Sequence, residues 1–203
     1  MTPRFESIAS EAICAFHDDR VERIEVRDET IADEPWASIA ANHRYNYLLW
    51  KEEDLARRRD VPDAAIAANK RAIDGYNQMR NDAIERIDRA LLSLLAGVTP
   101  LPGAWHNCET AGSIIDRLSI LALKIHHMHL QTLRADADPA HVARCNDKLA
   151  RLRMQRDDLA RCFDTLLESA AEGRAFWRVY RQFKMYNDPT LNPYLYDSGG
   201  QSR

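Results

Sequence analysis

The longest helical pattern in the chain, from about residue 62 to residue 96, limits the fold more than any other feature. Side chains that would share one face of this helix recur at alternating intervals of three and four residues. They are Ile66, Lys70, Ile73, Asn77, Arg80, Ile84, Ile87, Leu91 and Leu94. This spacing is typical of the seam between helices in a left-handed bundle. The pattern therefore predicts one long helix of an antiparallel helical bundle.

The remaining segments favour the same all-α class. The 7 glycines and 8 prolines gather in a few places, and segments of helical period run between them without a long alternating strand pattern. We expect five or six helices and an irregular C-terminal tail whose aromatic residues pack on the bundle. Asp60 before Pro62 and Asp138 before Pro139 are expected to cap helices. Besides 62–96, the helices are expected at about 3–24, 36–58, 110–133, 139–171 and 176–184.

The chain is expected to form a single domain. Its 203 residues suit one domain, and a hydrophobic share of 45% supplies a real core. The core is expected at about residues 36–196, preceded by an N-terminal helix and connector over 1–35. Residues 197–203 are expected to be a disordered tail.

Composition excludes several classes of function. The formal net charge of -3 gives no basic excess for broad binding to nucleic acid or an anionic membrane. No apolar run approaches the roughly 20 residues that a membrane span needs, and the N-terminus lacks a signal-peptide apolar block. None of the 4 cysteines forms a C-x-x-C pair. We therefore expect reduced thiols and a cytoplasmic protein.

Several of the expected helices carry polar residues on their inward stripes, where charge is costly unless it is paired. If these residues meet, they form a polar pocket of the kind that binds small molecules between helices. The helix start near residue 110 adds free N–H groups and positive dipole charge, which suit an anion, and Gly112 would let a ligand approach the backbone. The candidate ligand-binding residues are Asn46, Asp54, Lys70, Asn77, Arg80, Glu109, Thr110, Gly112, Ser113, Asp116, Arg117, Lys124 and Arg156.

An alternative explains the same residues without a ligand. They would be structural ion pairs, for example Glu53 or Asp54 with Arg80, or residues on exposed helix edges. An error of one residue in a stripe rotates a side chain by about 100°, so the sequence leaves both explanations open. In the first explanation, His43 and Glu53 are the candidate catalytic acid–base residues.

Metal binding is a weaker alternative. Acidic pairs such as Glu53–Asp54 and Glu85–Asp88 can hold Mg²⁺ for phosphate chemistry, as in the all-helical nucleotide pyrophosphatases, but the full acidic series of those enzymes is missing. The histidines of residues 126–129 have no acidic or cysteine partner at helical spacing. We assign no metal ligand, and the cofactor is unknown, with a divalent metal as the open alternative.

A cysteine nucleophile at Cys108 beside His106 is weaker still, because the two residues are close only in sequence. The chain also has no glycine-rich phosphate loop, dinucleotide fingerprint or Gly-x-Ser-x-Gly motif. No nucleotide-binding or hydrolase family is therefore indicated by these motifs.

Four long motifs extend over most of the chain, from about Trp36 to Tyr196. They are Asn46-x-x-Leu49-Trp50-x-Glu52-Glu53-Asp54-x-Ala56-Arg57, Lys70-Arg71-x-Ile73-Asp74-x-x-Asn77-Gln78-x-Arg80-Asn81-Asp82, Asn107-x-Glu109-Thr110-x-Gly112-Ser113-Ile114-Ile115-Asp116-Arg117-Leu118-Ser119-Ile120-Leu121 and Lys184-Met185-Tyr186-Asn187-Asp188-Pro189. The chain resembles a bacterial family, the domain of unknown function 4254. One position departs, since Ala111 stands where that family usually has proline.

The resemblance implies a context more than a reaction. Members of this family occur beside glycosyltransferases for cell-surface polysaccharide, which implies an accessory or transfer role there. Two hypotheses follow. In the first, the bundle binds or acts on an anionic metabolite such as a nucleotide sugar or sugar phosphate. In the second, it is a non-catalytic module that docks a glycosyltransferase or forms a homodimer through aromatic residues such as Trp50, Trp177 and Tyr194.

Overall fold

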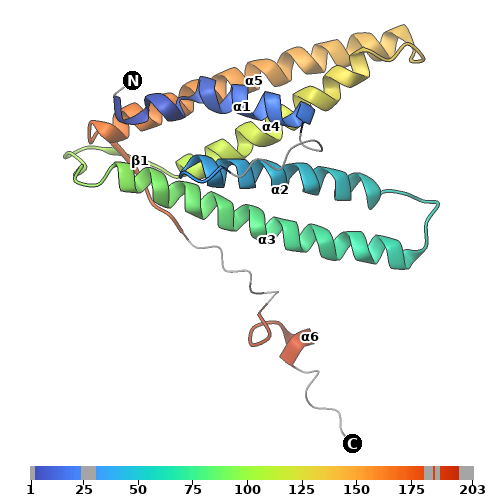
Figure 1. Cartoon of the computed structure of the whole chain (residues 1–203), viewed down its shortest axis with the longest axis horizontal. Helices are drawn as coiled ribbons and strands as arrows, with labels where there is room; N and C mark the ends of the chain where they lie inside the picture. Colours follow the sequence, from blue (N-terminus) through green and yellow to red (C-terminus); the bar gives the residue numbers. More distant parts are fainter. Residues whose placement is uncertain (1–2, 24–30, 181–184, 186–187, 197–203) are drawn as a thin grey trace, which may run out of the picture.

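The computed structural model describes residues 3–23, 31–180, 185 and 188–196 of the chain. Among these residues the structure is an all-α bundle, as predicted, with six α-helices, a short 3₁₀ helix and one two-stranded sheet. Two antiparallel helical hairpins cross each other, and a shorter helix lies against the second of them (Figure 1). No helix in the described part of the chain is both long and apolar enough to cross a membrane.

The first hairpin consists of α2 (Trp36–Leu55) and α3 (Asp63–Leu94), which pack along each other. The C-terminal half of α3 buries the predicted stripe at Ile87 and Leu91. The predicted cap is wrong, because Pro62 precedes the helix in extended conformation and no side chain caps it. Pro62 lacks an N–H, and Asp63 places its negative charge in the first turn, where the helix dipole favours it.

The second hairpin consists of α4 (Ala111–Thr132) and α5 (Pro139–Ala171). The start of α5 is as predicted, since the Asp138 side chain accepts a hydrogen bond of 3.0 Å from the N–H of Ala140 and proline opens the helix. The two helices supply much of the apolar core, including Ile115, Leu118 and Phe163.

The first predicted helix is split in two. A 3₁₀ helix, η1 (Pro3–Ile8), precedes α1 (Ser10–Arg23). The Ser10 N–H and hydroxyl both donate to the carboxylate of Asp164 on α5, at 2.9 and 2.6 Å. This contact supplies an acceptor to an N–H group that the start of a helix leaves without one. It fixes α1 as a separate element, and residues of both pieces, such as Phe5 and Ile13, remain buried.

The helix predicted at 176–184 is wrong where the structure describes it. Residues Ala175–Trp177 form strand β2, which pairs in parallel with β1 (Trp105–Asn107), in the register Trp105 with Ala175. Ala175 and Trp177 are buried while Phe176 faces out and stacks on His106, which is the alternation of a strand. Residues 178–180 are not helical, and residues 181–184 lie outside the described part.

The predicted packing of the C-terminal tail is not seen in its described residues. The last helix, α6 (Pro193–Tyr196), lies apart from the two hairpins (Figure 1). Tyr194 is 90% exposed, and Leu191 and Leu195 are exposed as well. The predicted disorder of residues 197–203 concerns residues outside the described part.

Candidate functional site

Polar side chains of α2, α3 and α4 meet inside the bundle around Asp116. Its Oδ1 accepts hydrogen bonds from Asn42 Nδ2 at 2.8 Å and from Asn46 Nδ2 at 2.9 Å. Asn46 also donates to Ser119 Oγ at 3.0 Å, and Arg80 Nε lies 3.8 Å from Asp116 Oδ1. Three predicted site residues, Asn46, Arg80 and Asp116, are therefore neighbours. All members except Arg80 are buried, so the cluster is an internal polar network.

His43 joins this network but is sealed from solvent. Its Nδ1 lies 2.8 Å from Ser119 Oγ, and its ring stacks on His17 of α1, with ring centroids 4.7 Å apart. Burial, followed by the positive charge of Arg20, lowers the pKa of His43 to about 4. The pKa of His17 lies well below its ordinary value, chiefly through burial. Both rings are neutral at pH 7, and His43 is only 1% exposed, so it is poorly placed as an acid or base toward a substrate.

The amides at the start of α4, expected to bind an external anion, are used by the protein itself. Thr110 caps the helix by accepting a hydrogen bond of 3.1 Å from the N–H of Ser113. The N–H of Gly112 donates to Asp88 Oδ1 on α3 at 2.7 Å. Asp88 is 1% exposed, and burial raises its pKa although hydrogen bonds from Thr110 and Gly112 counteract the shift. The anion at this helix start is thus the carboxylate of Asp88.

Gly112 serves the same contact. A Cβ atom at this position would lie 2.7 Å from the carbonyl oxygen of Ile84 and 2.9 Å from the Asp88 carboxyl group. Glycine therefore lets α4 approach α3, where the sequence suggested that it would let a ligand approach the backbone.

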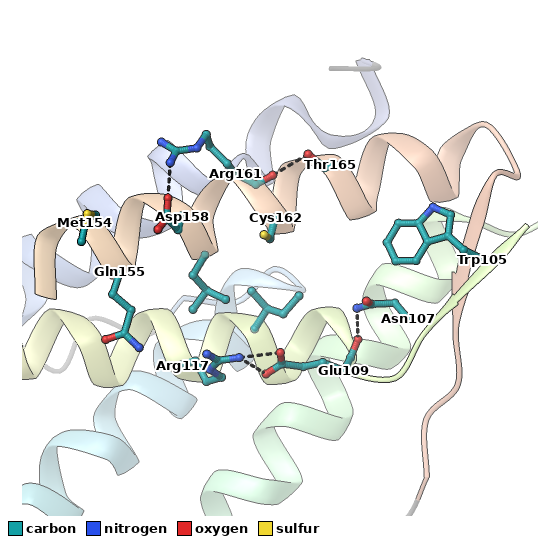
Figure 2. Close-up of a pocket in the computed structure, with 12 residues that line it drawn as sticks. Trp105, Asn107, Glu109, Arg117, Met154, Gln155, Asp158, Arg161, Cys162 and Thr165 are labelled. Atoms are coloured by element: carbon teal, nitrogen blue, oxygen red, sulfur yellow. Dashed lines mark hydrogen bonds and ion pairs between the residues drawn. The ribbon is translucent and has the colours of Figure 1, made fainter. Parts of the chain in front are cut away.

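A surface groove of about 790 Å³ lies beside this helix start, between α4, α5 and β1 (Figure 2). Arg117 on α4 lines the groove and donates two hydrogen bonds to the Glu109 carboxylate, at 2.9 and 2.7 Å. On α5, Arg161 pairs with Asp158. Trp105, 43% exposed, closes one end of the groove. The lining residues are Trp105, Asn107, Glu109, Ile114, Arg117, Met154, Gln155, Asp158, Leu159, Arg161, Cys162 and Thr165.

The other predicted site residues do not gather with either cluster. Glu53 pairs with Arg57 one turn away at 2.7 Å, and lies ten residues beyond His43, or about 15 Å along α2. Lys70 pairs with Asp74, and Arg156 with Asp18 at 2.7 Å. Asp54 and Lys124 are exposed, and Asn77 is half-buried one turn before Arg80. For Arg117, Lys70, Arg156 and Glu53 the structure shows the ion pairs of the alternative explanation, although with partners that the sequence did not indicate.

Three members of the internal cluster, His17, Asn42 and Ser119, were not predicted from the sequence, and Asp88 was considered only as one of an acidic pair for a metal. Helical spacing could have found two of them, because Asn42 lies one turn before Asn46 and Ser119 three residues after Asp116. His17 and Asp88 owe their roles to contacts between distant segments, which spacing does not reveal.

Metal-binding geometry is not found in the described residues, where no group of three or more His, Cys, Asp and Glu side chains could hold an ion. In the 126–129 stretch, His127 stacks on Trp50 with ring centroids 4.5 Å apart, and burial lowers its pKa. His106 stacks on Phe176, with ring centroids 4.8 Å apart. Stacking on an aromatic neighbour gives His127 and His106 a role in packing.

Comparison with known proteins places the chain in a family without assigning it an activity. No curated protein and no solved structure matches the chain. One family model matches residues 36–179, which run from the start of α2 through β2 and hold the internal cluster, apart from His17, and the groove. Because this match covers well over half of the sequence, the chain belongs to the family described as "Protein of unknown function (DUF4254)".

Proposed function

We propose that the protein binds a sugar phosphate or nucleotide sugar in the groove between α4 and α5, as an accessory to cell-surface polysaccharide synthesis. The observation that carries the proposal is that two exposed arginines, Arg117 on α4 and Arg161 on α5, are among the residues lining one groove, together with the exposed ring of Trp105. Such a groove offers cations for a phosphate and an aromatic face for a sugar or base. All four cysteines are free thiols, which supports a cytoplasmic setting for this role.

The carboxylates beside the two arginines do not prevent phosphate binding. Arg117 is held by Glu109, and Arg161 by Asp158, but all four side chains are substantially exposed. Exposed ion pairs of this kind contribute about 0–1 kcal/mol. A phosphate group accepts two parallel hydrogen bonds from a guanidinium, as a carboxylate does, and carries more charge. A phosphorylated ligand can therefore replace Glu109 on Arg117, while Glu109 turns to hydroxyl groups of the sugar.

The proposal is for binding and not for catalysis at the residues first suggested. His43 is enclosed and neutral, and Glu53 is about 15 Å away along the same helix, held by Arg57. Neither residue lines the groove. The polar residues that do line it, such as Asn107 and Gln155, are suited to hydrogen bonding with a sugar.

The test is isothermal titration calorimetry with UDP-glucose, GDP-mannose, glucose 1-phosphate, glucose and inorganic phosphate. We expect at least one phosphorylated sugar to bind more tightly than glucose or phosphate alone. Replacing Arg117→Gln should weaken that binding by about tenfold or more, because a hydrogen bond to a charged group contributes about 1.5–3 kcal/mol. Trp105→Leu should also weaken it, since the ring supplies one end of the groove.

Arg134→Gln is the matched control. Arg134 is as exposed as Arg117 and pairs with Asp136 in the loop before α5, at a position that does not line the groove. Its replacement should leave the affinity within about twofold, as expected for a surface charge outside the site. The proposal fails if no ligand binds, or if Arg117→Gln and Arg134→Gln have the same effect.

An interaction module is the second candidate, favoured by the exposed apolar side chains of the C-terminal segment. Of the aromatic residues first suggested, Trp177 is buried and Trp50 is stacked on His127, whereas Tyr194 is open to solvent together with Leu191 and Leu195. Large exposed apolar groups of this kind occur at protein contacts. Under this candidate, a glycosyltransferase or a second copy of the chain would cover them, and ending the chain after Tyr180 would abolish the complex without affecting ligand binding.

A further inference from the structure

Two buried imidazole rings join α1 to the rest of the bundle. His17 of α1 and His43 of α2 stack with their planes 20° apart, at 0% and 1% exposure. Among the described residues, both ring nitrogens of His17 and Nε2 of His43 have no hydrogen-bond partner. His43 Nδ1 alone is bonded, to Ser119 Oγ on α4. We propose that this stack is a pH-sensitive latch, which holds α1 on the bundle while both rings are neutral and releases α1 on acidification.

The surroundings of the stack oppose a proton on either ring. An imidazolium has two N–H donors and a full charge, and among the described residues three of the four ring nitrogens have no hydrogen-bond partner to compensate it. Burial is the main cause that lowers the pKa of both histidines, and each histidine would also feel a guanidinium, Arg156 for His17 and Arg20 for His43. A second proton on the stack would face the first across 4.7 Å.

Charged groups on the neighbouring helices do not reverse this effect. The carboxylate of Asp18 is bound by Arg156, and that of Asp116 is bound by Asn42 and Asn46 with Arg80 close by. Burial raises the pKa of the Cys14 thiol to about 11, so it is neutral. The titratable and charged groups that act on the stack or on its immediate neighbours include Cys14, Asp18 and Arg20 on α1, Arg80 on α3, Asp116 on α4, and Arg156, Asp157 and Asp164 on α5.

The direction of the pH effect follows from the lowered pKa values. A released histidine has a pKa of about 6.5, whereas His43 in the closed state has a pKa of about 4 and His17 one well below 6.5. Between these values the released state binds a proton that the closed state does not. The stabilisation by the latch is therefore complete above pH 6.5 and is lost as the pH falls below that value. For each histidine, the ratio of closed to released protein falls by about tenfold per pH unit.

α1 is the element that protonation would release. The hairpins α2–α3 and α4–α5 each pack along their own length, whereas α1 is a single helix that lies on α4 and α5. Its other polar attachments include the Ser10–Asp164 hydrogen bonds and the Asp18–Arg156 pair.

Hydrogen exchange measured by mass spectrometry at pH 7.5 and 5.5, corrected for intrinsic rates, tests the latch. We expect the opening constant of the α1 amides to rise by about tenfold for each histidine that becomes protonated, and hence up to about a hundredfold. Amides of α4 and α5 should change by much less. In His17→Phe, which keeps a ring on His43 but accepts no proton, the rise should not exceed about tenfold. His129→Phe, at an exposed position of α4, should behave as the unmodified chain.

Several results would overturn the latch. One is an α1 opening constant that is the same at both pH values. Another is a rise in the opening constant of α4 and α5 equal to that of α1. A third is a rise of about a hundredfold for α1 in His17→Phe. A measurement on the unmodified chain covers the case in which that variant does not fold. The imidazole NMR signals of closed His17 and His43 should stay at their neutral positions down to pH 5.5, and titration of the closed form near pH 6.5 would refute the proposal.

Discussion

At Gly112 the backbone of α4 lies against α3 with no room for a side chain. The N–H of Gly112 binds the buried Asp88 carboxylate, and the Ile84 carbonyl oxygen lies where a Cβ atom would be. A methyl group there must push apart two helices or break the Asp88 contact. The glycine is therefore a packing residue of the candidate site's frame, a few residues from Arg117 in the groove.

Replacing Gly112→Ala should lower the free energy of unfolding by about 1–3 kcal/mol, the usual cost of overpacking a core. Gly75→Ala is the matched control, because Gly75 is also inside a helix but has nothing within 4 Å of the added methyl group. That change should raise the free energy of unfolding by about 0.5–1 kcal/mol. Urea unfolding followed by circular dichroism measures both, and equal effects of the two changes would contradict the packing role of Gly112.

The candidate site was predictable only in part, for reasons that differ between residues. Asn46 and Arg80 were found because polar groups at seam positions of different helices must meet if the bundle forms. Asp116 was included because it belongs to the helix start near residue 110. Lys70 and Lys124 lie outside because their positions are near the edge of a stripe, where a small rotation decides between core and solvent. The role of the helix start was misjudged because its anion, Asp88, is supplied from 24 residues earlier in the chain.

At the scale of elements, the long helices were predictable and the short segments were not. α3 and α5 carry enough turns for their stripes to be clear, and Asp138–Pro139 is a strong start signal. β1 and β2 have three residues each, too few to show an alternation before their pairing is known. The break before α1 depends on Asp164, which is 154 residues from Ser10. Distance along the chain thus limits what local patterns can predict.

The cap of α5 offers a test at this scale. Asp138→Ala removes the acceptor of the Ala140 N–H and should lower the free energy of unfolding by about 1 kcal/mol. Asp136→Ala in the same loop removes only the exposed pair with Arg134 and should change the free energy of unfolding by less than about 0.5 kcal/mol. Thermal unfolding of the two variants measures the difference, and a larger loss in Asp136→Ala would show that the cap is not what stabilises this helix start.

At the scale of the whole molecule, the residues matched by the family model are not the same as the residues that form the core. The matched residues begin at Trp36, so η1 and α1 lie outside them. Yet Phe5, Ile8 and Ile13 belong to the same apolar cluster as Ile115 and Phe163 of the second hairpin. The N-terminal residues are therefore part of the core of this chain. By contrast, the described residues beyond position 180 leave their large apolar side chains exposed.

Two truncations separate these contributions. A chain that starts at residue 31 loses at least four buried apolar side chains, Phe5, Ile8, Ile13 and Val21, each of which contributes about 1.5–3 kcal/mol on burial. We expect its free energy of unfolding at pH 7.5 to fall by about 3 kcal/mol or more, with increased binding of a hydrophobic dye to the uncovered faces of α4 and α5. A chain that ends at Tyr180 should stay within about 0.5 kcal/mol of the full chain. If both truncations have the same effect, α1 is not a structural part of the bundle.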